Sequence, residues 1–156
     1  MIIKDIYSAD FLAYFGKSRD KIAQIKQIDA EIDLNSILKV LNITKQESVM
    51  FEQADIDNRK IMYNILQPIS RQKFVLARGI GQIVLNTDDI CVSQQFATEL
   101  LLPKKLIVKL MKDYSSPQKD LQKINVNKLI EYLVKKTNLS SESIKYRLLN
   151  LGIIEY

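Results

Sequence analysis

The chain has 156 residues, of which 47% are hydrophobic, with no histidine, no tryptophan and a single cysteine; 23 basic and 18 acidic residues give a formal net charge of +5. This length and apolar content suit one folded domain with a proper core. The absence of histidine excludes Ser-His-Asp and Cys-His catalysis and any His-ligated zinc site, and one thiol cannot complete a Cys₄ site. No apolar run is long enough to span a membrane, and the first 15 residues lack the unbroken apolar stretch of a signal peptide, so we expect a soluble cytoplasmic protein.

The positive charge is concentrated in the C-terminal third. The net charge is −1 over residues 1–103 and +6 over residues 104–156. Such asymmetry is typical of a surface that binds nucleic acid or an acidic partner, but it is equally typical of a solvated lysine-rich face.

The first third of the chain predicts short helices. Ser8 and Ser18 stand where helices can begin, and Gly16 can end the first of them. A stronger signal follows Asp33, which precedes an apolar stripe at i, i+3, i+4 and i+7. The stripe consists of Leu34, Ile37, Leu38 and Leu41.

After Ile43 the apolar pattern changes to the alternation of strands. Short apolar segments at residues 48–52 and 61–66 flank a turn-like cluster at residues 55–58. We therefore predict two antiparallel strands of a small sheet.

A central helix is predicted to begin at Pro68 and Ser70 and to run for about 15 residues. Its apolar residues lie on all sides, which is typical of a helix buried in the middle of a domain. Gly79 and Gly81 each cost about 1 kcal/mol relative to alanine, so we expect them to allow the close approach of another backbone segment.

Four more helices are predicted toward the C-terminus. One begins near Asp88 and Asp89 and stops at Pro103, and the next runs from Pro103 to Tyr114. Residues 115–118 read Ser-Ser-Pro-Gln and are the best linker candidate. Beyond them, residues 126–136 and 141–151 predict two helices joined by a short turn, in the manner of a helix-turn-helix pair, with Ser140 or Ser141 as the cap of the second.

Three stretches together resemble the ImmA/IrrE family of zincin-like metallopeptidases. Residues 74–86, FVLARGIGQIVLN, resemble the family's active-site helix F-T-x-A-H-E-L-G-H-x-x-L-H. Residues 96–103, FATELLLP, are similar to E-x-x-A-N-x-F-A-x-x-L-L-M-P, and residues 139–153, LSSESIKYRLLNLGI, to the common ending V-S-x-x-A-x-x-x-R-L-x-x-L-G. The match covers roughly residues 30–153, in the family's order.

This resemblance implies an α+β fold. We expect a zincin-like helical domain with a small, mostly antiparallel sheet and a C-terminal helix-turn-helix-like module. The corresponding division places an N-terminal helical segment at residues 1–28, the zincin-like domain at 29–114 and the C-terminal module at 120–156.

The family's metal site does not carry over. The H-E-x-x-H positions fall on Arg78, Gly79 and Gln82, and the third metal ligand falls on Val92. Arginine stays protonated, glutamine is a poor zinc ligand, and glycine and valine offer no ligand atom. The resemblance therefore implies a protein that is not an enzyme and carries neither zinc nor another cofactor.

The positions around the former site have open alternatives. Arg78 and Gln82 can line a binding groove together with Asp88, Asp89 and Glu99. Alternatively, Arg78 can pair with one of these three carboxylates and close the groove, or it can extend to the surface. The same three carboxylates can hold Mg²⁺ or Ca²⁺, although we favour helix capping by the two aspartates and a solvated glutamate.

Two further features concern Cys91 and the last helix. Cys91 has no histidine partner, so we expect a small half-buried side chain and not a nucleophile. Lys145, Tyr146 and Arg147 lie on the helix that would enter a DNA groove, and further positive charge comes nearby from Lys128, Lys135 and Lys136. The alternative is a small helical unit that packs on the core or holds a protein partner.

The resemblance also suggests a function. ImmA/IrrE members are commonly carried on prophages and other mobile elements near genes for helix-turn-helix repressors, and some relieve repression by cleaving the repressor or acting on it. We therefore expect a non-catalytic regulatory protein that binds a repressor or another transcription regulator, with no membrane association. The alternatives are a DNA-binding regulator acting through residues 126–152 and a peptidase with a non-standard site.

Overall fold

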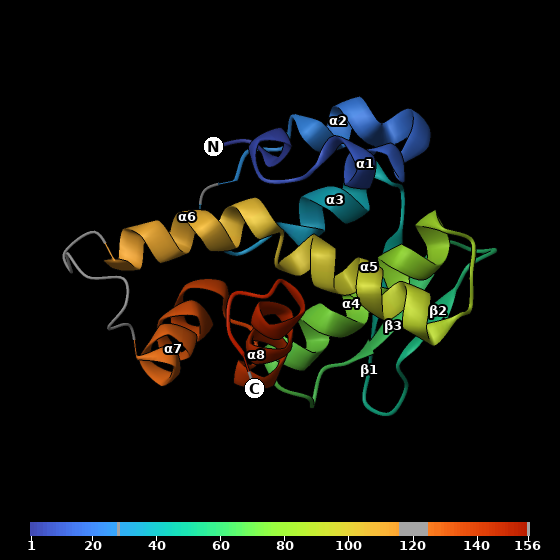
Figure 1. Ribbon diagram of the computed structural model, residues 1–156. Helices are drawn as coiled ribbons and strands as arrows, with labels where there is room; N and C mark the ends of the chain where they lie inside the picture. Colours follow the sequence, from blue (N-terminus) through green and yellow to red (C-terminus); the bar gives the residue numbers. More distant parts are fainter. Residues whose placement is uncertain (28, 116–124, 156) are drawn as a thin grey trace.

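A computed structural model describes residues 1–27, 29–115 and 125–155, and the fold is α+β as predicted (Figure 1). The long helix α4 (Ile69–Val84) lies near the middle of the molecule, the small sheet lies on one side of it, and the other helices lie around its remaining sides. The short N-terminal elements are η1 (Ile3–Asp5), α1 (Ala9–Ala13), η2 (Gly16–Ser18), α2 (Arg19–Ala23) and α3 (Leu34–Val40). The sheet consists of β1 (Thr44–Ser48), β2 (Gln53–Asp55) and β3 (Lys60–Asn64), and it is followed by the central helix α4. The chain then forms α5 (Ile90–Leu101), α6 (Lys104–Ser115), α7 (Val126–Thr137) and α8 (Ser141–Asn150).

Side-chain caps begin several helices where the sequence predicts them. The Ser8 hydroxyl accepts the Phe11 N–H at 3.1 Å, and the Asp33 carboxylate accepts the Ser36 N–H at 3.0 Å. Ser140, and not Ser141, caps α8. Each of these bonds satisfies a backbone donor that has no partner within its helix.

The sheet differs from the prediction in two ways. Its order is β1-β3-β2, with β1 parallel and β2 antiparallel to β3, so the sheet is mixed and not mostly antiparallel. The expected strand at residues 48–52 is wrong. The strand ends at Ser48, whose hydroxyl accepts the N–H groups of Met50 and Phe51 and turns the chain away. The turn at residues 55–58 is confirmed, because the Asp55 carboxylate accepts the Asn58 N–H at 3.1 Å.

Helix α4 is the predicted central helix, and its glycines explain how closely it packs. A Cβ atom placed on Gly79 would lie 2.8 Å from the side chain of Ile61 on β3. A Cβ atom on Gly81 would lie 2.8 Å from the ring of Phe96 on α5. The close neighbours are therefore side chains and not the backbone segment that we expected. With glycine at both positions, the sheet and α5 can approach two sides of one helix.

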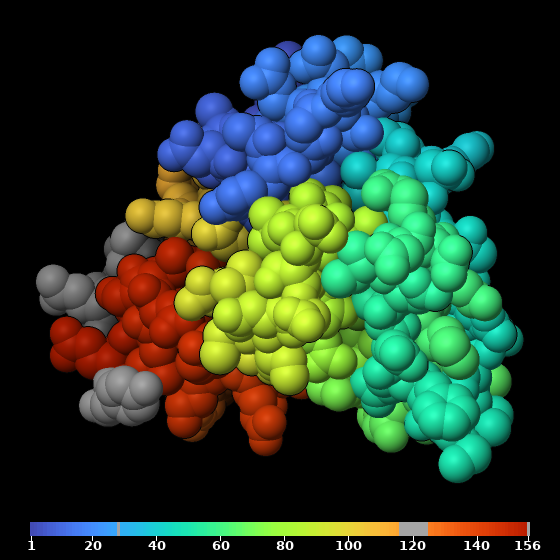
Figure 2. All heavy atoms as spheres, turned by 90° about the vertical axis from the view of Figure 1, so that its right-hand side faces the viewer, coloured from blue at the N-terminus to red at the C-terminus, as the bar shows by residue number. Residues whose placement is uncertain are grey.

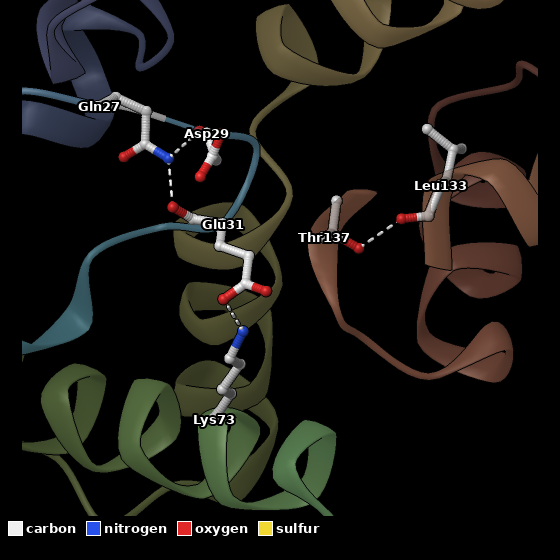
Figure 3. Close-up of polar contacts among 6 residues, drawn as sticks. All are labelled: Gln27, Asp29, Glu31, Lys73, Leu133 and Thr137. Carbon is white, nitrogen blue, oxygen red and sulfur yellow. Dashed lines mark hydrogen bonds and ion pairs between the residues drawn. The ribbon is translucent and has the colours of Figure 1, made fainter. Parts of the chain in front are cut away.

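The N-terminal elements are joined to this centre by polar and aromatic contacts. The Gln27 amide donates to the backbone carbonyls of Asp29 and Glu31, and Glu31 forms an ion pair of 2.6 Å with Lys73 on α4 (Figure 3). The ring of Phe11 lies 5.0 Å, centre to centre, from that of Phe96 on α5. Residues 1–27 therefore share the hydrophobic core of the rest of the chain.

The last two helices form the predicted pair. Asn138 adopts a left-handed conformation with φ of 57° and ends α7, whose last turn carries a bond of 2.7 Å from the Thr137 hydroxyl to the Leu133 carbonyl (Figure 3). Leu133 and Leu148 are buried in the common core. Of the linker candidate, residues 116–118 lie outside the described residues, as do residue 28 and residues 120–124 at the expected boundaries.

A candidate binding cleft beside helix α4

Three of the four positions that correspond to the family's metal site share one cleft. Arg78, Gly79 and Gln82 follow one face of α4 at i, i+1 and i+4 and line a cleft of about 230 Å³. Its other lining residues come from the sheet region, from α4 and from the start of α5: Glu52, Gln53, Ala54, Ile61, Val75 and Ile90. The fourth position, Val92, does not line the cleft; it lies 40% exposed in the first turn of α5.

Arg78 carries a positive charge that has no ion-pair partner among the residues that the structure describes. Its side chain is half-buried, and burial lowers the pKa of the guanidinium. The neighbouring charge of Arg71 lowers that pKa further, whereas Glu52 opposes the shift. Glu52 is itself paired with Arg71 at 3.0 Å. Among the described residues that line the cleft, Glu52 is the one carboxylate, and it is already held by another arginine.

Of the alternatives for Arg78, the structure does not bear out an ion pair with a nearby carboxylate. Within residues 1–27, 29–115 and 125–155, no ion pair joins Arg78 to Asp88, Asp89 or Glu99. The Asp89 carboxylate instead accepts the N–H groups of Cys91 and Val92 and caps α5, and Asp88 is exposed. Capping by Asp89 is the alternative that the sequence favoured.

The five residues predicted to form one groove are divided in the structure. Arg78 and Gln82 line the cleft beside α4, whereas Glu99 lines a separate cavity of about 610 Å³. That cavity lies between α5 and α8 and has a polar wall of Gln94, Gln95, Thr98 and Glu99. The sequence analysis missed this cavity, although the polar residues at i, i+1, i+4 and i+5 of α5 were visible as a signal.

The three predicted nucleic-acid contacts are also divided. Lys145 and Tyr146 are exposed, but Arg147 is half-buried in the wall of the larger cavity. Its Nε donates to the Leu102 carbonyl at 2.9 Å, and burial lowers the pKa of its guanidinium against the opposing charge of Glu99. Arg147 therefore holds α8 to the end of α5 and does not extend into solvent with its neighbours.

Cys91 differs from its expected environment, since its side chain is exposed and not half-buried. It lines the larger cavity together with Tyr146 and Arg147. Among the residues that the structure describes, no group of three or more histidine, cysteine, aspartate or glutamate side chains is arranged to hold a metal ion.

In the described parts of the chain, no helix has both the length and the apolar character needed to cross a membrane. No protein-family model matches the chain, and a search of curated proteins finds no significant relative.

Proposed function

We propose that this protein is a catalytically inactive relative of the ImmA/IrrE metallopeptidases that acts as a regulatory binding protein. In this proposal it belongs to the cytoplasmic proteins of prophages or other mobile elements and engages a repressor or another transcription regulator without cleaving it. The observation that carries the proposal is the cleft itself. Arg78, Gly79 and Gln82 line it together, and none of the three offers a good metal ligand or a general base.

The packing around Gly79 supports binding in place of hydrolysis. The corresponding residue in the family is the glutamate that activates the metal-bound water, as the resemblance implies. Here a Cβ atom alone at Gly79 would lie 2.8 Å from Ile61, a fully buried side chain. Ile61 therefore occupies the space beside Gly79 that a larger side chain would need, and a glutamate at Gly79 would require Ile61 to move.

The polar side chains that line the cleft suit the recognition of a protein. The half-buried Arg78 guanidinium and Gln82 amide make no side-chain hydrogen bond within the described residues, so their donors and acceptors are available to a partner. Hydrogen bonds from half-buried polar groups contribute most to the binding free energy when a bound partner excludes the remaining water.

The proposal is tested by co-purification of the full chain with a helix-turn-helix repressor encoded beside it. We expect the repressor to be retained, and its intact mass by mass spectrometry to be unchanged. Retention should weaken on Arg78→Ala and persist on Lys145→Ala, which removes an exposed cation that does not line the cleft. A cleaved repressor, stoichiometric zinc in the purified protein, or no retention at all would contradict the proposal.

A DNA-binding regulator is the second candidate, and a group of lysines favours it. Lys109 of α6 and Lys135 and Lys136 of α7 line a third cavity, of about 370 Å³. Asp29, Glu31 and Asp113 line the same cavity and weaken its positive field, so we rank this function second. This function predicts that the protein binds duplex DNA with an affinity that falls steeply as the salt concentration rises. The double variant Lys135→Gln and Lys136→Gln should lose this binding.

A further inference from the structure

An exposed apolar surface lies at one end of the sheet. It has six large side chains, from the β1–β2 loop, the β3–α4 loop and the first residue of α4, and we call it the apolar rim. Its members are Val49, Met50, Phe51, Ile65, Leu66 and Ile69. Met50 is 74% exposed and Leu66 is 73% exposed, so neither contributes much to the core. The sequence analysis missed this surface because it assigned the first three residues to a strand.

The two loops of the apolar rim are held together by one residue. Strands β1 and β3 are parallel, and Ser48 pairs with Asn64, so both loops leave the sheet at the same end. The Ser48 hydroxyl accepts the N–H groups of Met50 and Phe51 at 3.1 and 2.9 Å. The Ser48 carbonyl accepts the Ile65 N–H at 2.9 Å. The rim is therefore one ordered surface and not two independent loop tips.

The apolar rim continues into the Arg78 cleft. Phe51 is followed directly by Glu52 and Gln53, both of which line the cleft. The ion pair from Arg71 on α4 to Glu52 fixes this junction at 3.0 Å. Figure 2 shows the sheet region and α5 side by side on one face of the molecule, and residues of both line the cleft. A bound chain can thus contact the rim and the cleft at once.

Charge and size define what the cleft accepts. The Arg78 guanidinium has no ion-pair partner in the described chain, and its planar donors match a carboxylate. At about 230 Å³ the cleft is smaller than the roughly 300–1,000 Å³ of small-molecule sites, which favours a single side chain or chain end. A surface of exposed large apolar residues next to such a charge is typical of a protein interaction site.

We propose that the cleft and the apolar rim together bind a segment of a protein partner that places one carboxylate on Arg78 and its neighbouring apolar side chains on the rim. This inference rests on the proposed function, because it specifies the chemistry of the partner that the regulatory protein binds. A second copy of this chain and an anionic membrane are the occupants that the test must separate from it.

A peptide-display experiment on the full chain tests the inference. Random dodecapeptides are selected on the immobilised wild-type protein, and we expect the enriched sequences to combine Asp or Glu with Leu, Ile or Phe. The best peptide and its Asp→Asn or Glu→Gln analogue are then titrated calorimetrically against the wild type and Arg78→Gln. We expect the amide analogue to bind wild type at least about tenfold more weakly, and the two peptides to bind Arg78→Gln equally.

Two further variants test the rim. Leu66→Ser should weaken the best peptide about three- to tenfold, since it removes one exposed apolar contact. Val108→Ser, a change at another exposed aliphatic residue, on α6, should leave affinity unchanged. Circular dichroism of each variant verifies the fold.

The other outcomes overturn the inference. They are enrichment of peptides without an acid, equal binding of the acid and amide peptides to wild type, concentration-dependent dimers that Leu66→Ser abolishes, and binding to phosphatidylserine vesicles that the peptide does not compete. Retention of an intact repressor that Arg78→Ala weakens but Leu66→Ser leaves unaffected, together with equal binding of the acid and amide peptides, would remove this inference and leave the proposed function standing. Peptide binding as expected, with no regulator retained, would support this inference and contradict the proposed function.

Discussion

The Tyr7 hydroxyl donates a hydrogen bond to the backbone carbonyl of Leu100, a residue 93 positions later in the chain. Leu100 lies in the last turn of α5, where the backbone carbonyl groups receive no hydrogen bond from within the helix and need a donor from elsewhere. Both residues are buried, so water cannot replace this bond. The N-terminal segment therefore completes the end of the helix whose other end borders the Arg78 cleft.

Removing this hydroxyl should destabilise the whole chain. Tyr7→Phe leaves the buried Leu100 carbonyl without a donor, and we expect a loss of about 1–3 kcal/mol in the free energy of unfolding, measured by urea denaturation. Tyr14→Phe is the matched control, because Tyr14 is 53% exposed, and its change should stay within about 0.5 kcal/mol. Equal losses of unfolding free energy in both variants would show that the hydrogen bond from Tyr7 to Leu100 does not contribute specifically to stability.

The same residue gives a prediction for high pH. Burial raises the pKa of Tyr7 well above its usual value. Above a pH of about 10 the unfolded chain loses the phenol proton while the folded chain keeps it, so the free energy of unfolding should fall as the pH rises. Below that pH both states hold the proton and the effect is absent. Urea denaturation between pH 8 and 11 should give a shallower fall for Tyr7→Phe than for wild type, and identical slopes would contradict the assignment.

Gly79 should reject even the smallest side chain. Gly79→Ala improves helix propensity by about 1 kcal/mol but forces the new Cβ against three carbon atoms of Ile61 at 2.8–2.9 Å. Overpacking typically costs about 1–3 kcal/mol, so after the gain in helix propensity we expect a net loss of up to about 2 kcal/mol by thermal or urea denaturation. Adding Ile61→Val removes one methyl group, and the double variant should recover part of the loss. Losses that simply add would show that the two residues do not press on one another.

The contrast between α4 and β1 shows what local sequence can and cannot predict. Helix α4 begins after Pro68, and buried residues follow on most of its sides, so its own pattern identifies it. Strand β1 spans Thr44–Ser48, its first four residues are exposed, and one edge of it is unpaired within the described parts of the chain. Such a strand has no apolar alternation to mark it, since its place is set by hydrogen bonds to β3.

The candidate site shows the same division. The i and i+4 positions of Arg78 and Gln82 on one helix fix their common face, and the structure brings them to one cleft as that spacing requires. Glu99 and Arg147 belong to helices distant in sequence, and only the packing of α8 beside α5 brings them to a common cavity. Neither residue could be placed from its own segment.

Arg147 provides a test between a structural and a DNA-contacting role. Because its Nε holds the Leu102 carbonyl at 2.9 Å and its side chain is half-buried, Arg147→Ala should lower the free energy of unfolding by about 1–3 kcal/mol. Lys145→Ala, the exposed neighbour, should change it by less than about 0.5 kcal/mol. A stable Arg147→Ala variant that loses only salt-dependent duplex binding would favour the DNA-binding function.

Arg78 should behave in the opposite way, because its role in the proposal is to meet a partner and not to hold the fold. A half-buried charge without an ion pair gains little from its surroundings, so Arg78→Gln should leave the free energy of unfolding unchanged or raise it by up to about 1 kcal/mol. Arg71→Gln is the matched control, because it breaks the ion pair between Arg71 and Glu52. Since Arg71 is exposed, we expect the loss in the free energy of unfolding to stay below about 1 kcal/mol. Urea denaturation of both variants, together with retention of the repressor, separates the two roles. A strongly destabilised Arg78→Gln protein would mean that the arginine supports the fold, and its loss of binding would then say nothing about the cleft.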